Sequence, residues 1–177
     1  MKAQKAALTG ILAATICLLA PFSFPIGAIP VSLATLAIYI ISGTVKTKIS
    51  VSAVIIYILL GAIGLPVFSA FQGGFQTITG LTGGYILGYI PCALIIGMLS
   101  EKYESKKWVY PLSMILGTVA CYLTGTLWYM FQADCSFATA MTVCVIPFII
   151  ADIIKISAAC TLCITLRKRL SVLQKIY

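Results

Sequence analysis

Long apolar stretches separated by short polar segments make up almost the whole chain. Six of these stretches are apolar enough to form membrane helices, since a span needs about 20 mostly apolar residues. They cover residues 6–24, 30–44, 49–65, 82–99, 108–131 and 138–166. The pattern therefore predicts an all-α integral membrane protein of about six transmembrane helices.

The composition agrees with a protein dissolved in lipid. Of 177 residues, 61% are hydrophobic and only 9% are charged, too few to cover the surface of a water-soluble domain of this size. Six spans leave only short loops, so we expect one transmembrane substrate-binding domain over residues 1–177 and no separate catalytic domain. Read alone, the first stretch also fits a signal peptide, but five further apolar stretches favour a retained membrane helix.

The basic residues predict the orientation of the helices. Lys and Arg in short loops stay on the cytoplasmic side of the membrane. With six spans, every basic residue except Lys155 falls on one face, which places both termini in the cytoplasm. These residues are Lys2, Lys5, Lys46, Lys48, Lys102, Lys106, Lys107, Arg167, Lys168, Arg169 and Lys175. The net charge of +8 is thus a topology signal, and we expect no nucleic-acid partner.

The sixth stretch contains Asp152 and Lys155, the only charged residues within any predicted span. A charge at the centre of a membrane helix costs about 2.5–3.5 kcal/mol on the insertion scale. Residues three apart share one helix face and can pair. One interpretation is an ion pair that merely neutralises itself. The other is a polar ligand site inside the bundle, which we favour because buried ion pairs stabilise proteins poorly.

A second feature is the uncharged segment 61–85, which is rich in glycine and phenylalanine. Irregular backbone at membrane depth is tolerated where it is buried or lines a cavity. We interpret the segment as a lid or cavity wall, with a packed re-entrant turn as the alternative. Gln72, Gln76, Thr79 and Thr82 would offer neutral hydrogen bonds to a ligand.

Small residues recur at four-residue spacing near the N-terminus. Rows of this kind let membrane helices approach closely. The spacing alone leaves internal packing and a partner surface equally open. Ala3 and Ala7 are four residues apart, as are Ala6, Gly10 and Ala14.

Motifs for catalysis or cofactor binding are scarce. The chain has no histidine, which removes the commonest general base and metal ligand. It also lacks the phosphate-binding loop of ATPases. Cys160 and Cys163 have C-x-x-C spacing but lie in an apolar stretch, where cysteine is usually a small filler. We therefore expect no enzyme activity, no cofactor and no metal.

Several motifs together resemble the BioY family, the biotin-specific substrate-binding (S) components of energy-coupling-factor (ECF) transporters. They are Gly-Leu-Pro-Val-Phe at 64–68, Thr-Gly-Gly-Tyr at 82–85, Pro147-Phe148 followed by Asp152 and Lys155, Pro-Val-Ser-Leu at 30–33, and Gly-Thr-Leu-Trp at 125–128. The resemblance covers nearly the whole chain. Leu81 replaces a usual proline of the family, and Ala34 replaces a frequent glutamine.

The resemblance implies a multi-pass protein of a prokaryotic cell membrane that captures biotin from outside. Its partners would be a transmembrane coupling protein and two cytoplasmic ATPases, which would explain the missing phosphate loop. The row formed by Ala3, Ala7, Gly10 and Ala14 would then dock on the coupling protein. Two other classes stay open: a proton-coupled carrier for a small carboxylated metabolite with Asp152 as proton relay, and a small intramembrane enzyme.

The resemblance also implies a biotin site. Asp152 suits the ureido N–H groups as an ionised acceptor, and Lys155 suits the ureido carbonyl or the carboxylate. We favour the ureido end for both, because neighbours three apart lie about 5–6 Å from each other and grip one end of a ligand. The remaining candidates are Phe68, Phe71, Gln72, Gly73, Gly74, Thr82, Gly83, Gly84, Tyr85 and Trp128.

Overall fold

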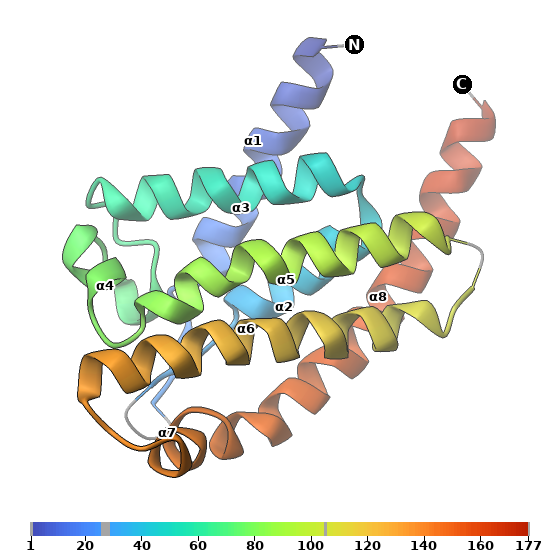
Figure 1. Cartoon of the computed structure of the whole chain (residues 1–177). Coiled ribbons are helices and arrows are strands. Elements are labelled where there is room, and N and C mark those ends of the chain that lie inside the picture. Colours follow the sequence, from blue (N-terminus) through green and yellow to red (C-terminus); the bar gives the residue numbers. More distant parts are fainter. Residues whose placement is uncertain (1, 26–28, 105, 177) are drawn as a thin grey trace.

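The structure is a computed structural model that describes residues 2–25, 29–104 and 106–176. Its elements, in chain order, are α1 (Lys2–Leu19), β1 (Ser23–Phe24), β2 (Val31–Ser32), α2 (Ala34–Thr44), α3 (Thr47–Ala62), the 3₁₀ turn η1 (Ser69–Phe71), α4 (Phe75–Thr79), α5 (Gly83–Lys102), α6 (Val109–Ala133), α7 (Phe137–Cys144) and α8 (Ile146–Ile176). The helices form a bundle in which α3, α5 and α6 run side by side (Figure 1). The predicted all-α membrane fold is confirmed.

Among the residues that the structure describes, three helices are long and apolar enough to cross a membrane by themselves. They are α5, α6 and residues Ile146–Lys168 of α8. Three shorter apolar helices, Ala3–Leu19, α2 and α3, complete the bundle. With 11 residues, α2 is only about 16 Å long, which is short of the roughly 30 Å apolar core of a bilayer. Its Ala37, Ile38 and Tyr39 are buried, so α2 serves as the central core helix.

The first two predicted spans were wrong where they overlap the β ribbon, and the first ends at Leu19 instead of residue 24. The second begins at Ala34 instead of residue 30, because Val31 and Ser32 pair with β1 as a two-stranded ribbon. Ser32 Oγ donates to the Ala20 carbonyl oxygen at 2.6 Å and accepts from Ala34 N at 2.9 Å. The Ser32 hydroxyl therefore accepts the N–H of the first residue of α2, at the point where the chain changes from extended to helical.

The sixth predicted span is two helices, α7 and α8. The break falls at Val145, whose φ and ψ of −124° and −55° are not helical. Pro147 follows in the first turn of α8, where its missing N–H is tolerated, but it could not continue a helix from α7. Ser136 starts α7 by accepting a hydrogen bond from Thr139 N.

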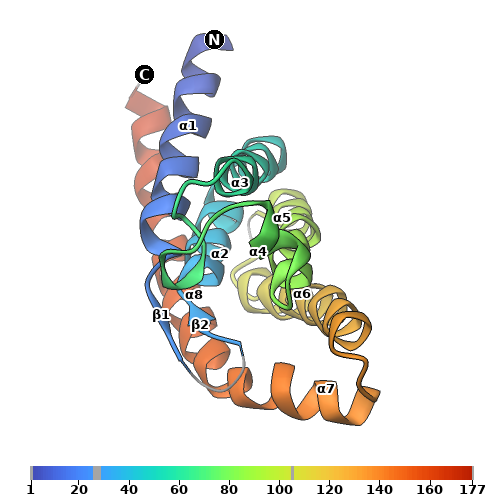
Figure 2. The same cartoon turned by 90° about the vertical axis from the view of Figure 1, so that its left-hand side faces the viewer.

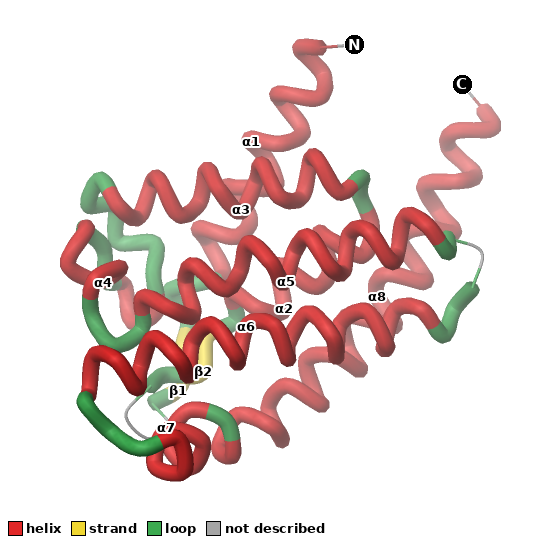
Figure 3. Tube along the Cα trace, in the orientation of Figure 1, coloured by secondary structure: helices red, strands yellow, loops and turns green. Residues whose placement is uncertain are grey.

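The two ends of the bundle differ. At one end, short turns join α2 to α3 and α5 to α6; the opposite end carries the β ribbon, η1, α4 and α7 (Figure 3). At the short-turn end Glu101 accepts from Thr47 Oγ1 at 2.6 Å, and Arg167 pairs with Glu104 at 3.0 Å. The basic turns that were predicted to share one face thus lie at one end of the bundle. The orientation of this end toward the cytoplasm stays a prediction.

Candidate ligand site

A cavity of about 610 Å³ lies in the half of the bundle away from the basic turns. Helices α2, α3, α5, α6 and α8 contribute side chains to it, and the segment from Phe68 to Thr82 lies across it. Figure 2 views this end, with η1 and α4 in front of the bundle. Its volume lies within the usual range for a small-molecule site.

The charged pair of α8 lines this cavity. Lys155 Nζ lies 3.2 Å from Asp152 Oδ1, and the two residues are only 8% and 6% exposed. Lys155 Nζ also donates to Thr35 Oγ1 of α2 at 3.0 Å. The predicted pairing and its position inside the bundle are confirmed.

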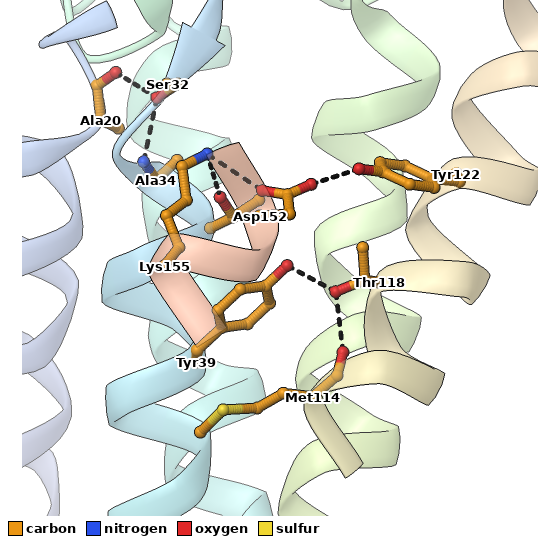
Figure 4. Close-up of polar contacts among 10 residues, drawn as sticks. Ala20, Ser32, Ala34, Tyr39, Met114, Thr118, Tyr122, Asp152 and Lys155 are labelled. Atoms are coloured by element: carbon orange, nitrogen blue, oxygen red, sulfur yellow. Dashed lines mark hydrogen bonds and ion pairs between the residues drawn. The ribbon is translucent and has the colours of Figure 1, made fainter. Parts of the chain in front are cut away.

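Two tyrosines extend this polar wall. Tyr122 of α6 donates its hydroxyl proton to Asp152 Oδ2. Below the pair, Tyr39 Oη and Thr118 Oγ1 lie 2.5 Å apart, and Thr118 donates to the Met114 carbonyl oxygen at 2.7 Å. Figure 4 shows these groups converging from α2, α6 and α8. The wall therefore consists of two neighbouring hydrogen-bonded groups, one around Asp152 and one around Thr118, contributed by three helices.

An aromatic wall comes from α3, α5 and the segment after α3. The Phe68 ring contacts Tyr57 edge-on at 5.6 Å between centroids, and Tyr57 lies 6.4 Å from Tyr89. Phe68 is 1% exposed and lines the cavity, as the sequence predicted. Flat apolar rings facing a polar network suit a ligand with an apolar ring and a polar head.

The segment between α3 and α4 is fastened to the N-terminal part of the chain. Ala70 N lies 3.0 Å from both the Pro21 carbonyl oxygen and Ser23 Oγ. Phe71 packs edge-on against Phe22 at 5.8 Å and is 60% exposed, so it lies outside the cavity lining. Gly74, with φ of +94°, supplies the left-handed turn before α4.

A second attachment holds the other end of this segment to α6. Trp128 Nε1 donates to the Gly80 carbonyl oxygen at 2.9 Å, and Gln132 Nε2 donates to that of Thr79. Gly83 and Gly84, at the start of α5, are buried, and a Cβ on Gly84 would lie 2.2 Å from Trp128 Cβ. Trp128 and both glycines therefore position the segment instead of lining the cavity.

The structure brings together most of the predicted ligand residues. Those that line the cavity are Phe68, Gln72, Gly73, Thr82, Tyr85, Asp152 and Lys155. Phe71, Gly74, Gly83, Gly84 and Trp128 are not part of the lining. Of the neutral hydrogen-bonding candidates, Gln76 lines the cavity and Thr79 does not.

Sequence reasoning missed several polar residues of the cavity lining, among them Thr35, Tyr39, Thr118 and Tyr122. They lie in apolar stretches, where no charge marks them. A weak signal was present in α6, because Thr118 and Tyr122 are four residues apart and thus share a helix face. Their role becomes evident only when α2, α6 and α8 are packed together.

The small residues of α1 lie on the outside of the bundle. Ala3, Ala7, Gly10 and Ala14 are exposed, and a Cβ on Gly10 would meet nothing within 4 Å. The opposite face, with Ala13 and Ile16, is buried. Their part in docking stays a prediction.

Fold and site define a polytopic helical membrane protein with a cavity of ligand size that has aromatic walls and a buried charged pair. The BioY family model matches residues 1–172. The biotin transporter BioY of Thermotoga maritima is 37% identical over 159 residues, 90% of this chain and 93% of that protein. The biotin transporter BioY2 of Lactococcus lactis is 32% identical over 143 residues, 81% and 79% of the two chains. The chain therefore belongs to the BioY family.

A solved structure shares the fold. It is the crystal structure at 2.1 Å of the S-component for biotin from an ECF-type ABC transporter. The TM-score is 0.86 with 24% identity, over 94% of this chain and 92% of the other. The arrangement of helices described above is thus the fold of that S-component.

Proposed function

We propose that this protein captures biotin and takes it up across the cell membrane as the substrate-binding component of an ATP-driven ECF transporter. The observation that carries the proposal is the buried Asp152–Lys155 pair on the wall of a 610 Å³ cavity in a chain of the BioY family. The whole chain, residues 1–177, would act as one substrate-binding domain.

The polar wall matches the ureido ring of biotin. Asp152 offers carboxylate oxygens to an N–H group, and Lys155 Nζ, 3.2 Å away, offers a donor to the neighbouring carbonyl. Gln72, Gln76 and Thr82 would take the carboxylate end of the ligand. The apolar sulfur ring would lie against the Phe68 side of the cavity.

Energy for transport would come from partners. The chain has no phosphate-binding loop, and we propose that it uses a transmembrane coupling protein and two cytoplasmic ATPases. The exposed small-residue face of α1 would dock on the coupling protein, since small residues allow close helix contact in lipid. The chain itself would bind and release biotin without covalent chemistry.

Calorimetry with the purified protein in detergent tests the ligand and the site together. We expect tight biotin binding by the wild type and its loss in Asp152→Asn and Lys155→Ala. Asp134→Asn and Lys107→Ala remove the same charges at exposed positions and serve as matched controls. A folded wild type that does not bind biotin would contradict the proposal.

Uptake by cells separates this function from a proton-coupled carrier. Deleting the ATPases should abolish biotin uptake, whereas an uncoupler applied while ATP is maintained should leave it intact. The opposite pattern would make Asp152 a proton relay.

A further inference from the structure

Both carboxylate oxygens of Asp152 are held by donors from different helices. Lys155, on the same helix, donates to Oδ1, and Tyr122 reaches across from α6 to Oδ2 (Figure 4). Rotation about the last torsion of an aspartate is otherwise broad. Because each oxygen accepts from a different donor, the orientation of the Asp152 carboxylate plane is fixed.

The contact also determines which kind of hydrogen bond Tyr122 can offer to a ligand. A tyrosine hydroxyl has one proton and accepts through its lone pairs. Because the proton of Tyr122 is directed to Asp152, only lone pairs remain for the cavity. Tyr85 is in the same situation, since its hydroxyl donates to the Cys144 carbonyl oxygen at 2.7 Å.

The donors near the pair are correspondingly few. An ammonium group has three N–H bonds. Lys155 directs one to Asp152 and one to Thr35, which leaves one for a ligand. Beside the pair, a ligand thus meets one N–H donor among the acceptor oxygens of Asp152 and Tyr122, and Tyr85 adds a further acceptor oxygen to the cavity lining.

We propose that Tyr122 is a positioning residue for Asp152 and that, with Tyr85, it makes this part of the cavity selective for head groups with N–H donors beside a single acceptor. This inference rests on the proposed function and deepens it. A cyclic urea has two N–H groups flanking one carbonyl. A cyclic carbonate of the same shape has ring oxygens in place of the N–H groups, so acceptor atoms of the ligand would face acceptor oxygens of the protein.

Tyr122→Phe removes the hydroxyl and keeps the ring. Biotin affinity should fall roughly 10- to 100-fold, the range expected for a hydrogen bond to a charged group. Tyr129 lies on the same helix and is also half-buried, so Tyr129→Phe is the matched control and should bind as wild type.

Two further measurements separate positioning from general damage. Infrared difference spectra against Asp152→Asn identify the carboxylate band of Asp152, and Tyr122→Phe should shift that band whereas Tyr129→Phe should not. Competition with a cyclic-carbonate analogue of biotin measures selectivity, and the preference for biotin should shrink in Tyr122→Phe.

The outcomes are distinct. If the wild type binds biotin normally and Tyr122→Phe leaves the affinity, the infrared band and the selectivity unchanged, this inference is overturned while the proposed function stands. A folded wild type that binds no biotin overturns the proposed function and the selectivity with it.

Discussion

The ring of Phe68 lies directly on Gly61, so closely that a Cβ at position 61 would be 2.1 Å from Phe68 Cζ. The glycine on α3 thus makes the space that lets Phe68 reach the cavity wall. Gly61→Ala should displace the ring, lower the free energy of unfolding by about 1–3 kcal/mol and weaken biotin binding. Detergent unfolding and calorimetry measure these changes. Gly10→Ala, with open space around it, should change neither, and a Gly61→Ala protein as tight as wild type would contradict the packing described.

Removing one partner of the charged pair should lower stability, whereas removing both should restore stability without restoring binding. Lys155→Met leaves Asp152 buried without its partner and should cost about 3–5 kcal/mol of unfolding free energy. The double variant Asp152→Leu/Lys155→Met should regain most of that loss and still bind no biotin. Unfolding midpoints in mixed micelles, beside calorimetry, check both. A double variant as unstable as the single one would mean that the pair is needed for folding.

The exposed face of α1 should matter for transport and not for binding. Ala7→Leu and Gly10→Leu add bulk where α1 would meet the coupling protein. Biotin binding in detergent should be unchanged, whereas copurification with the coupling protein and ATP-dependent uptake should fall strongly. Ala158→Leu, an exposed small residue on α8, is the matched control. Normal uptake by both α1 variants would place the docking surface elsewhere.

The bond from Trp128 to Gly80 should control how long the ligand stays. Trp128→Phe removes the 2.9 Å hydrogen bond that ties the segment before α5 to α6. A loss of about 1 kcal/mol would raise the biotin dissociation rate by roughly five-fold, which a chase with unlabelled biotin measures. The control is Trp108→Phe, an exposed tryptophan at the other end of α6. Equal rates in both variants would show that this contact does not hold the segment closed.

Much of the helical bundle could be predicted because lipid imposes strong rules. The apolar stretches that became α5 and α6 were correct to within a few residues, since both are bounded by clear changes in polarity. Asp152 and Lys155 were identifiable as a site because charged residues inside a span are costly and usually mark a functional position. These inferences needed only local sequence.

The remaining features depend on contacts between distant segments. Pro147 is a local signal for a break, but Pro91 lies inside the continuous helix α5; that residues 137–144 form a separate helix becomes evident only with α7 packed across the end of the bundle. Phe71 and Phe68 look alike in the sequence, yet one contacts Phe22 outside and the other lines the cavity. Tyr122 became a site residue through its partner 30 positions away.

The helices also approach one another closely in the half of the bundle between the cavity and the basic turns. A Cβ on Gly43 would lie 2.6 Å from Cys163 Sγ, one on Gly97 3.1 Å from the backbone of Thr47, and one on Gly117 2.8 Å from Ile96. An exit along the bundle axis would have to separate these pairs of helices. On the proposed function we therefore expect that a ligand held in the cavity leaves by the end at which it entered, and that delivery to the cytoplasm requires this end of the molecule to turn, as a unit, toward the other side of the membrane.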